Sequence, residues 1–205
     1  MKVNKTTSKP RRKPAQSRSS NTVDCILEAS AHILVSEGQG KLNTNHIAKI
    51  AGVSVGSIYQ YFGNKETILA ELGNRHIDEM LTIIMATLQK LPSLDLKEAL
   101  ETMVHAVMDA HKQEPQLHQV LVRELNKLDG YTRVEELDGV LLNLTESFLK
   151  SRAHEISSED LKLASFVVMQ TIENLTHQGV LFAPQIDLSK LTKECSHMLY
   201  CYLTG

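Results

Sequence analysis

Apolar residues recur at three- and four-residue spacing along almost the whole of this 205-residue chain. Side chains at this spacing share one face of an α-helix, and no segment shows the alternation that is typical of a half-buried β-strand. Turn residues and capping signals divide the pattern into about nine helices. The chain is therefore predicted to be all-α, with a small N-terminal helical unit followed by a larger one.

Several of the expected helices begin or end at a recognisable signal. Asp95 followed by Glu98 resembles a capping box, and Ser157 with Asp160 is interpreted in the same way. Gly179 is expected to end the helix that this second pair begins. After a first helix that lies before residue 38, the expected helices cover about residues 44–51, 55–62, 65–90, 95–111, 115–128, 132–152, 158–178 and 188–203.

Charge is distributed unevenly along the chain, although the formal net charge is only −2. The first 18 residues contain no acid, so the excess of acidic residues lies in the remainder. A basic arm of this kind suggests an anionic partner, with nucleic acid or a membrane surface as candidates, and a disordered solvated tail is the alternative. The cations of the arm are Lys2, Lys5, Lys9, Arg11, Arg12, Lys13 and Arg18.

Other sequence signals exclude several classes of protein. Cys25, Cys195 and Cys201 form neither a disulfide framework nor a metal-binding pattern. No apolar run approaches the roughly 20 residues that a membrane-spanning helix needs. The basic N-terminus is not followed by the apolar region of a secretory signal. The chain is therefore expected to be cytoplasmic, with no membrane partner.

Residues 43–65, NTNHIAKIAGVSVGSIYQYFGNK, have the pattern of two short helices joined by a tight turn. Asn43 is suited to cap the first helix and Ser54 the second. Gly52 lies at the turn, where its lack of a Cβ permits a positive φ. Such a pair is a helix-turn-helix, whose second helix enters the major groove of DNA.

The outer face of the second short helix carries groups that suit DNA. Ser57 can donate to phosphate, Gln60 can bind an adenine edge, and Val55 can pack on a thymine methyl group. Gly56 permits close approach of the backbone, and Lys65 at the next helix start suits a phosphate. The spacing alone is equally compatible with an ordinary helical hairpin that has a polar outer face.

The stretch ILEASAHILVSEG…IAKIAGVSVGSIYQYFGNKETIL, residues 26–69, resembles the DNA-binding segment of the tetracycline-repressor (TetR/AcrR) family. It contains the fairly specific core AGVS-x-G-x-x-Y-x-YF-x-x-K. The resemblance implies a three-helix DNA-binding domain that is joined by its fourth helix to a larger domain. That larger domain binds a ligand and forms the dimer in such regulators.

The resemblance also implies roles for residues at matching positions. Tyr59 and Lys65 match positions that mostly contact phosphate. The last two long helices, about 158–178 and 188–203, match those that form a four-helix dimer interface. Residues at family positions that touch DNA are Thr44, Val55, Gly56, Ser57, Tyr59, Tyr61 and Lys65, and Gln60 joins them from its place on the outer face.

Three residues depart from the family pattern in this segment. Gln39 stands where an aromatic residue is usual, and His46 where an acid often completes the helix cap. Val55 replaces a residue that is often polar or basic. These departures concern the operator sequence that the chain reads and leave the expected fold unchanged.

Motifs of catalysis are missing from the sequence. There is no G-x-S-x-G motif, no phosphate-binding glycine loop and no zinc-protease helix. His197 and Cys201 lie four residues apart, but zinc normally needs three or four ligands. We therefore expect no catalytic residue, no cofactor and no metal site.

Seven methionines lie along the chain. Adaptable side chains of this kind fill ordinary cores, and they also line pliable cavities for apolar or amphipathic molecules. Both interpretations stand at this point. If a cavity is present, the residues expected to contribute to it are Met80, Met103, His105, His111, Tyr131, Met169, Gln170, Glu173, Asn174 and His177.

These patterns together predict a DNA-binding transcriptional regulator, a homodimeric repressor that a small apolar or amphipathic effector releases from double-stranded operator DNA. Apolar residues on more than one face around residues 140 and 167 agree with a subunit partner. The expected organisation is a disordered basic arm (1–18), a helix-turn-helix domain (19–64) and an effector-binding and dimerisation domain (65–205). The alternative is a helical ligand carrier or protein-interaction module that has lost DNA binding.

Overall fold

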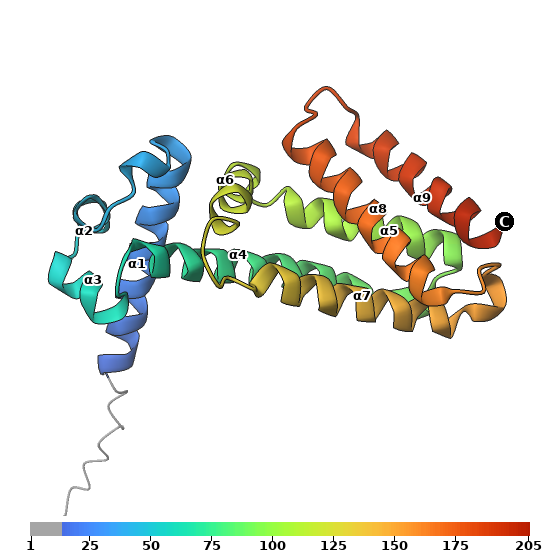
Figure 1. Ribbon diagram of the computed structural model, residues 1–205, viewed down its shortest axis with the longest axis horizontal. Coiled ribbons are helices and arrows are strands. Elements are labelled where there is room, and N and C mark those ends of the chain that lie inside the picture. Colours follow the sequence, from blue (N-terminus) through green and yellow to red (C-terminus); the bar gives the residue numbers. More distant parts are fainter. Residues whose placement is uncertain (1–13) are drawn as a thin grey trace, which may run out of the picture. The chain divides into compact units, whose positions relative to one another are not determined.

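The computed structural model describes residues 14–205, which form nine α-helices, three short 3-10 turns and no β-strand (Figure 1). The all-α prediction is confirmed. No helix in this part of the chain is long and apolar enough to cross a bilayer. The helices are α1 (Pro14–Ser36), α2 (Thr44–Ala51), α3 (Val55–Tyr61), α4 (Lys65–Leu88), α5 (Leu96–His111), α6 (Pro115–Leu125), α7 (Arg133–Ser151), α8 (Leu161–Leu181) and α9 (Leu188–Thr204).

The chain divides into two compact units, of which the first ends at Ile68 and the second begins at Leu69. The boundary therefore falls within the first turns of α4, a few residues after the position expected from the sequence. Helix α1 begins at Pro14, so residues 14–18 of the predicted arm are helical. Residues 1–13 lie outside the described residues, and the disordered arm stays a prediction.

The first unit is held together by α1, which packs against α2, while α2 packs against α3. Local caps fix where the short helices begin. The Asn43 side chain accepts a hydrogen bond from the His46 amide, and Ser54 accepts one from the Ser57 amide. The core that these helices share consists of Ile26, Leu27, Ile33, Leu34, Leu42, Ile47, Ala48, Ile58, Phe62 and Ile68.

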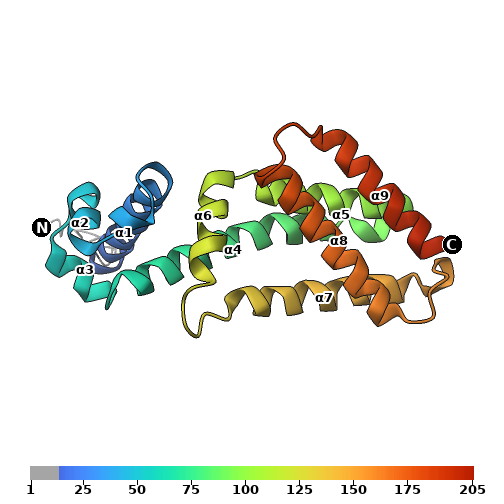
Figure 2. The same cartoon turned by 45° about the horizontal axis from the view of Figure 1, so that its top comes forward.

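The second unit is built around α5, which packs against both α8 and α9, while α7 packs against α8 (Figures 1 and 2). Its main core is almost entirely aliphatic, as the scarcity of aromatic residues predicts. The buried members of this core are Leu91, Leu96, Ala99, Leu100, Met103, Val104, Leu149, Ala164, Val168, Ile172, Cys195, Leu199 and Leu203.

Of the two caps predicted in this unit, the structure confirms the first and corrects the second. Asp95 and Glu98 form a complete capping box at the start of α5. Helix α8 is capped by Asp160 alone, whose carboxylate accepts from the Leu163 amide at 2.9 Å. Ser157 instead donates from its hydroxyl to the Thr204 carbonyl at 2.7 Å, tying the loop before α8 to the end of α9.

Gly179 does not end α8, which continues to Leu181. This glycine is buried where α8 meets α9, and a Cβ built on it would lie 2.5 Å from a methyl carbon of Leu191. The residue serves a close helix contact. The prediction of a helix end was wrong because the two uses of glycine look alike in a sequence.

A second close contact gives a testable difference between two helical glycines. A Cβ on Gly73 of α4 would lie 2.6 Å from Leu125 of α6, whereas a Cβ on Gly139 of α7 meets nothing within 4 Å. We expect Gly73→Val to lower the free energy of unfolding by about 1–3 kcal/mol through overpacking. Gly139→Ala should raise it by about 0.5–1 kcal/mol through helix propensity. Urea denaturation at fixed protein concentration measures both, and a stabilised Gly73→Val variant would contradict the contact.

Candidate DNA interface and effector pocket

Helices α2 and α3 form the predicted helix-turn-helix. Gly52 ends α2 with φ 66° and ψ 28°, the left-handed conformation that penalises a Cβ. Ile47 and Ile58 are fully buried and hold the two helices together from the inside. The caps at Asn43 and Ser54 and the turn at Gly52 therefore form as the sequence predicts, and together they make a helix-turn-helix.

The residues predicted to touch DNA gather on α3 and at the starts of α2 and α4. Tyr59 is 57% exposed and Tyr61 40% exposed, which are large values for aromatic side chains. Gly56, Gln60 and Lys65 are exposed as well, whereas Thr44, Val55 and Ser57 are half-buried. An exposed pair of tyrosines on one short helix is a surface that stacking and hydrogen bonding to a partner can use.

Two polar contacts order this surface. The hydroxyls of Thr44 and Tyr59 lie 3.4 Å apart, which links the start of α2 to the middle of α3. The hydroxyls of Ser54 and Ser57 lie 2.8 Å apart, at the N-terminus of α3. Helix α3 itself carries no charged side chain, so the cation nearest to it in the sequence is Lys65 at the start of α4.

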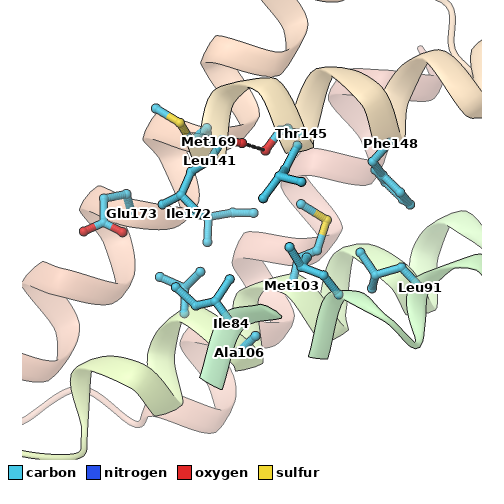
Figure 3. Close-up of a pocket in the computed structure, with 13 residues that line it drawn as sticks. Ile84, Leu91, Met103, Ala106, Leu141, Thr145, Phe148, Met169, Ile172 and Glu173 are labelled. Atoms are coloured by element: carbon cyan, nitrogen blue, oxygen red, sulfur yellow. Dashed lines mark hydrogen bonds between the residues drawn. The ribbon is translucent and has the colours of Figure 1, made fainter. Parts of the chain in front are cut away.

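The second unit contains a pocket between α4, α5, α7 and α8 (Figure 3). Its empty space, the open mouth included, is about 530 Å³. Thr145 and Glu173 are its polar lining residues, and the Thr145 hydroxyl donates to the Leu141 carbonyl at 2.9 Å. The apolar lining residues are Ile84, Leu88, Leu91, Met103, Ala106, Val107, Leu141, Leu144, Phe148, Met169 and Ile172.

The structure brings three of the predicted effector residues, Met103, Met169 and Glu173, onto the wall of this pocket. Met80 packs beside it with Ile84 and Ala110 but is not part of the wall. The other apolar residues of the wall were not predicted from the sequence. Their spacing is that of ordinary core residues, so no local signal distinguishes them.

Four further predicted effector residues lie away from the pocket wall. His105 is half-exposed and lies 4.0 Å from Glu101 one turn earlier. The Tyr131 hydroxyl donates to the Asn74 side chain at 3.1 Å. Gln170 and Asn174 hydrogen-bond to each other along α8, where the Asn174 amide donates to both oxygens of Gln170.

The last two predicted effector residues, His111 and His177, belong to a cluster of four histidines from four helices. His76 comes from α4, His111 from α5, His118 from α6 and His177 from α8. The ring centroids of His111, His118 and His177 are 4.9–5.5 Å apart. His76 and His118 share a hydrogen bond of 2.8 Å between Nε2 and Nδ1. Nε2 of His118 has no hydrogen-bond partner within residues 14–205.

The protonation of this cluster is uneven. Burial, followed by the nearby His111, lowers the pKa of His76 to about 4 and that of His118 to about 3. Burial also acts to lower the pKa of His111, but Glu173 and the Val107 carbonyl outweigh it and raise that pKa. Nε2 of His111 lies 3.3 Å from the Glu173 carboxylate, close enough for charge attraction although not aligned for a hydrogen bond. Glu173, which lines the pocket, therefore favours the protonated form of His111.

Comparison with known proteins matches both units to family models. The model "Bacterial regulatory proteins, tetR family" matches residues 26–72. The model "Tetracyclin repressor-like, C-terminal domain" matches residues 95–203, which is more than half of the chain. The chain belongs to the TetR family. The resemblance found in the sequence is thereby confirmed, and the chain is a helix-turn-helix transcriptional regulator.

Several relatives match along most of their length. The fatty acid metabolism regulator protein of Bacillus subtilis is 24% identical over 177 residues, which cover 85% of this chain and 91% of the relative. Bacillus subtilis FadR, solved in complex with stearoyl-CoA, is 25% identical with a TM-score of 0.69, and the match covers 88% of this chain and 98% of that one. FadR from Bacillus halodurans is 23% identical with a TM-score of 0.69, covers 93% and 97%, and supports the fold. The Bacillus subtilis FadR is a transcriptional regulator, and the other two relatives are regulators of fatty acid metabolism or degradation.

In this TetR-family chain the departure at His46 has a structural counterpart. Its ring Nε2 lies 2.9 and 3.0 Å from the two carboxylate oxygens of Glu37, so α2 is tied to the residue that follows α1. The cap of α2 is made by Asn43 without an acid at position 46. His46 therefore contacts Glu37 and takes no part in the cap of α2 through its side chain.

Proposed function

We propose that the chain is a homodimeric repressor that binds operator DNA through α3 and is released by an effector with a long apolar chain. The observation that carries the effector class is the apolar pocket, in a chain 25% identical to a FadR that binds stearoyl-CoA. A fatty acyl chain suits this wall because it can bury methylene groups without leaving polar groups unpaired. We propose acyl-CoA esters as the first ligands to test.

Operator contact rests on residues at the surface of α3 and on Lys65 at the start of α4. In the proposed complex, Gln60 and Val55 meet base edges, while Tyr59, Ser57 and Lys65 meet the phosphate backbone. The two α3 helices of a dimer would enter successive major grooves about 34–36 Å apart. Binding and release are equilibria, so the proposed function involves no catalytic step and acts in the cytoplasm, where operator DNA lies.

The proposed dimer uses α8 and α9. Leu163 and Phe166 on α8, and Met198 and Tyr202 on α9, are between 43% and 56% exposed. Large apolar side chains gathered on two adjacent helices are typical of a surface that a partner covers. A four-helix interface between two copies would remove them from water.

Helix α4 is the proposed route of regulation. It begins with Lys65 at the candidate DNA interface and continues to Ile84 and Leu88 on the pocket wall. An effector that binds best when α4 is displaced would therefore weaken operator binding. Coupling of this kind typically amounts to about 1–3 kcal/mol.

The test is to select genomic fragments that the full-length protein binds and to footprint them, the region upstream of its own gene included. We expect the protein to protect a palindromic DNA sequence, and we expect added stearoyl-CoA to abolish this protection. Gln60→Ala should lower operator affinity by about 1–3 kcal/mol and relax the preference at one base pair. Gln116→Ala at the exposed start of α6 is the matched control. Ligand binding without any DNA binding would instead support a helical ligand carrier.

The basic arm gives a separate prediction. Residues 1–13 contain six of its seven cations. If these contact phosphates beside each half-site, their removal should flatten the dependence of log affinity on log salt by roughly one unit per lost contact. A variant with the six cations replaced by Gln keeps the length and should behave in the same way. An unchanged slope in both variants would favour the solvated tail.

A further inference from the structure

A group of three possible metal ligands lies where α4 meets the start of α6. His76 and Glu79 come from α4, one turn apart, and Glu114 directly precedes the first residue of α6. One ring nitrogen of His76 and one carboxylate oxygen from each glutamate lie within 4.8 Å of one another. The group is separate from the pocket wall and from the candidate DNA interface.

The imidazole of the group is the buried member. His76 is only 6% exposed, and its Nε2 shares the 2.8 Å hydrogen bond with Nδ1 of His118, which is 8% exposed. This leaves Nδ1 of His76 as the nitrogen for a further ligand. A metal-bound histidine regularly donates its other ring N–H to an acceptor that fixes its orientation, and His118 occupies that place.

The two carboxylates supply the charge. Among the side chains that the structure describes, residues 20–205, neither Glu79 nor Glu114 forms an ion pair with a Lys or Arg, and both are exposed. Two carboxylates held beside a neutral imidazole repel each other unless a cation lies between them. The oxygens already lie within 4.8 Å of each other, and the exposure and length of the two side chains allow them to reach the roughly 3 Å spacing that bonds of about 2.1 Å to one ion require.

We propose that His76, Glu79 and Glu114 bind a divalent first-row transition-metal ion, with His118 as the positioning residue. One nitrogen and two oxygen ligands suit Zn²⁺, Co²⁺ or Mn²⁺, whereas Ca²⁺ and Mg²⁺ take oxygen ligands. Three protein ligands leave at least one position on the ion for water. The ion would join α4 directly to α6, so that it acts on the helix that begins at the candidate DNA interface.

No local pattern in the sequence marks this group as a metal site. His76 and Glu79 are spaced as any i, i+3 pair on a helix, and Glu114 comes from a different element. The pair singled out in the sequence, His197 and Cys201, lies on α9 with Sγ 3.8 Å from Nε2. That exposed pair is the competing site that an experiment must separate from the group on α4 and α6.

The test is isothermal titration of the full-length protein with Zn²⁺ after removal of metal by a chelator. We expect one ion per chain with micromolar or tighter affinity. Glu79→Gln and Glu114→Gln should each weaken binding at least tenfold, and the double variant should abolish it. Glu159→Gln, an exposed carboxylate outside the group, is the matched control. Circular dichroism verifies that each variant is folded.

A second comparison separates the site from adventitious binding. A His197→Asn, Cys201→Ser variant should keep the full stoichiometry, and His118→Leu should keep it with roughly tenfold weaker affinity, as loss of an outer-shell partner does. With Co²⁺, the ring protons of His76 should show paramagnetic shifts in NMR spectra. Equal Zn²⁺ binding by wild type and by the Glu79, Glu114 double variant would overturn the proposal. Loss of Zn²⁺ binding in the His197→Asn, Cys201→Ser variant would overturn it as well.

Discussion

Replacing Ala106 by Phe is expected to abolish release of operator DNA by long-chain acyl ligands while leaving operator affinity within about threefold of wild type. Ala106 lines the pocket from α5 and is 3% exposed, so the added ring must occupy the space that an acyl chain would take. Excluding three or four methylene groups costs about 3 kcal/mol of binding, at about 0.8 kcal/mol each. This corresponds to a loss of roughly a hundredfold in ligand affinity.

The measurement is titration of the protein with stearoyl-CoA, together with operator release followed by fluorescence anisotropy of labelled DNA. Ala153→Phe, which adds the same ring at an exposed site in the 3-10 turn after α7, is the control. Overpacking should also cost Ala106→Phe about 1–3 kcal/mol of stability, which thermal unfolding detects. Wild-type ligand affinity in a folded Ala106→Phe variant would place the ligand elsewhere.

The helix-turn-helix was predictable because each of its determinants is local. Asn43, Gly52 and Ser54 act on backbone groups within a few residues of themselves. A short stretch of sequence is therefore enough to predict where the two helices begin and where the turn lies. The capping box at Asp95 was predictable for the same reason. Ser157 was not, because its partner, the Thr204 carbonyl, lies at the far end of the chain.

A cavity was one of two interpretations that the methionines allowed, and only some residues of the observed pocket were among those expected to line it. Met103 and Met169 were found because methionine is an adaptable side chain. The other aliphatic residues of the wall have the same spacing in the sequence as core residues. Whether they enclose a cavity depends on how completely the side chains of the facing helices fill the space between them, and the sequence does not show this. Polar residues such as His105 and Tyr131 were expected there, yet each has a partner elsewhere in the second unit.

The histidine cluster could not be assembled from the sequence. Its members come from four helices, and no two of them are spaced as neighbours on one helix face. Only tertiary packing brings His118 within hydrogen-bond distance of His76 and beside His111. The helices that carry these histidines can be predicted from the sequence. Which rings come into contact depends on how α4, α5, α6 and α8 pack against one another.

The free energy of unfolding is expected to fall by about 3 kcal/mol between pH 7 and pH 5, because of these buried histidines. His76 and His118 have pKa values lowered by burial to about 4 and about 3, against about 6.5 in an unfolded chain. Between pH 6.5 and these values the unfolded state binds protons that the folded state does not. Stability from this source is therefore lost as the pH falls through that window.

His111 acts in the opposite direction. Burial lowers its pKa, but Glu173 and the Val107 carbonyl more than compensate and raise it. Its stabilising contribution is complete below about pH 6.5 and is lost as the pH rises through the raised value. The offset on acidification is limited because an unfolded histidine is itself mostly protonated at pH 5. The contributions of His76 and His118 to the free energy of unfolding each fall by about 2 kcal/mol between pH 7 and pH 5. This fall is larger than the gain from His111.

Urea unfolding at pH 7 and pH 5, with a chelator present, measures the difference, and His118→Asn tests its origin. An asparagine amide can still hydrogen-bond to His76 but does not titrate, so the acid-induced loss should shrink by roughly half. His154→Asn is the matched control, because the His154 side chain is 78% exposed and lies outside the cluster. Equal acid sensitivity in wild type and His118→Asn would mean that other groups, and not the buried cluster, set the lower pH limit of the fold.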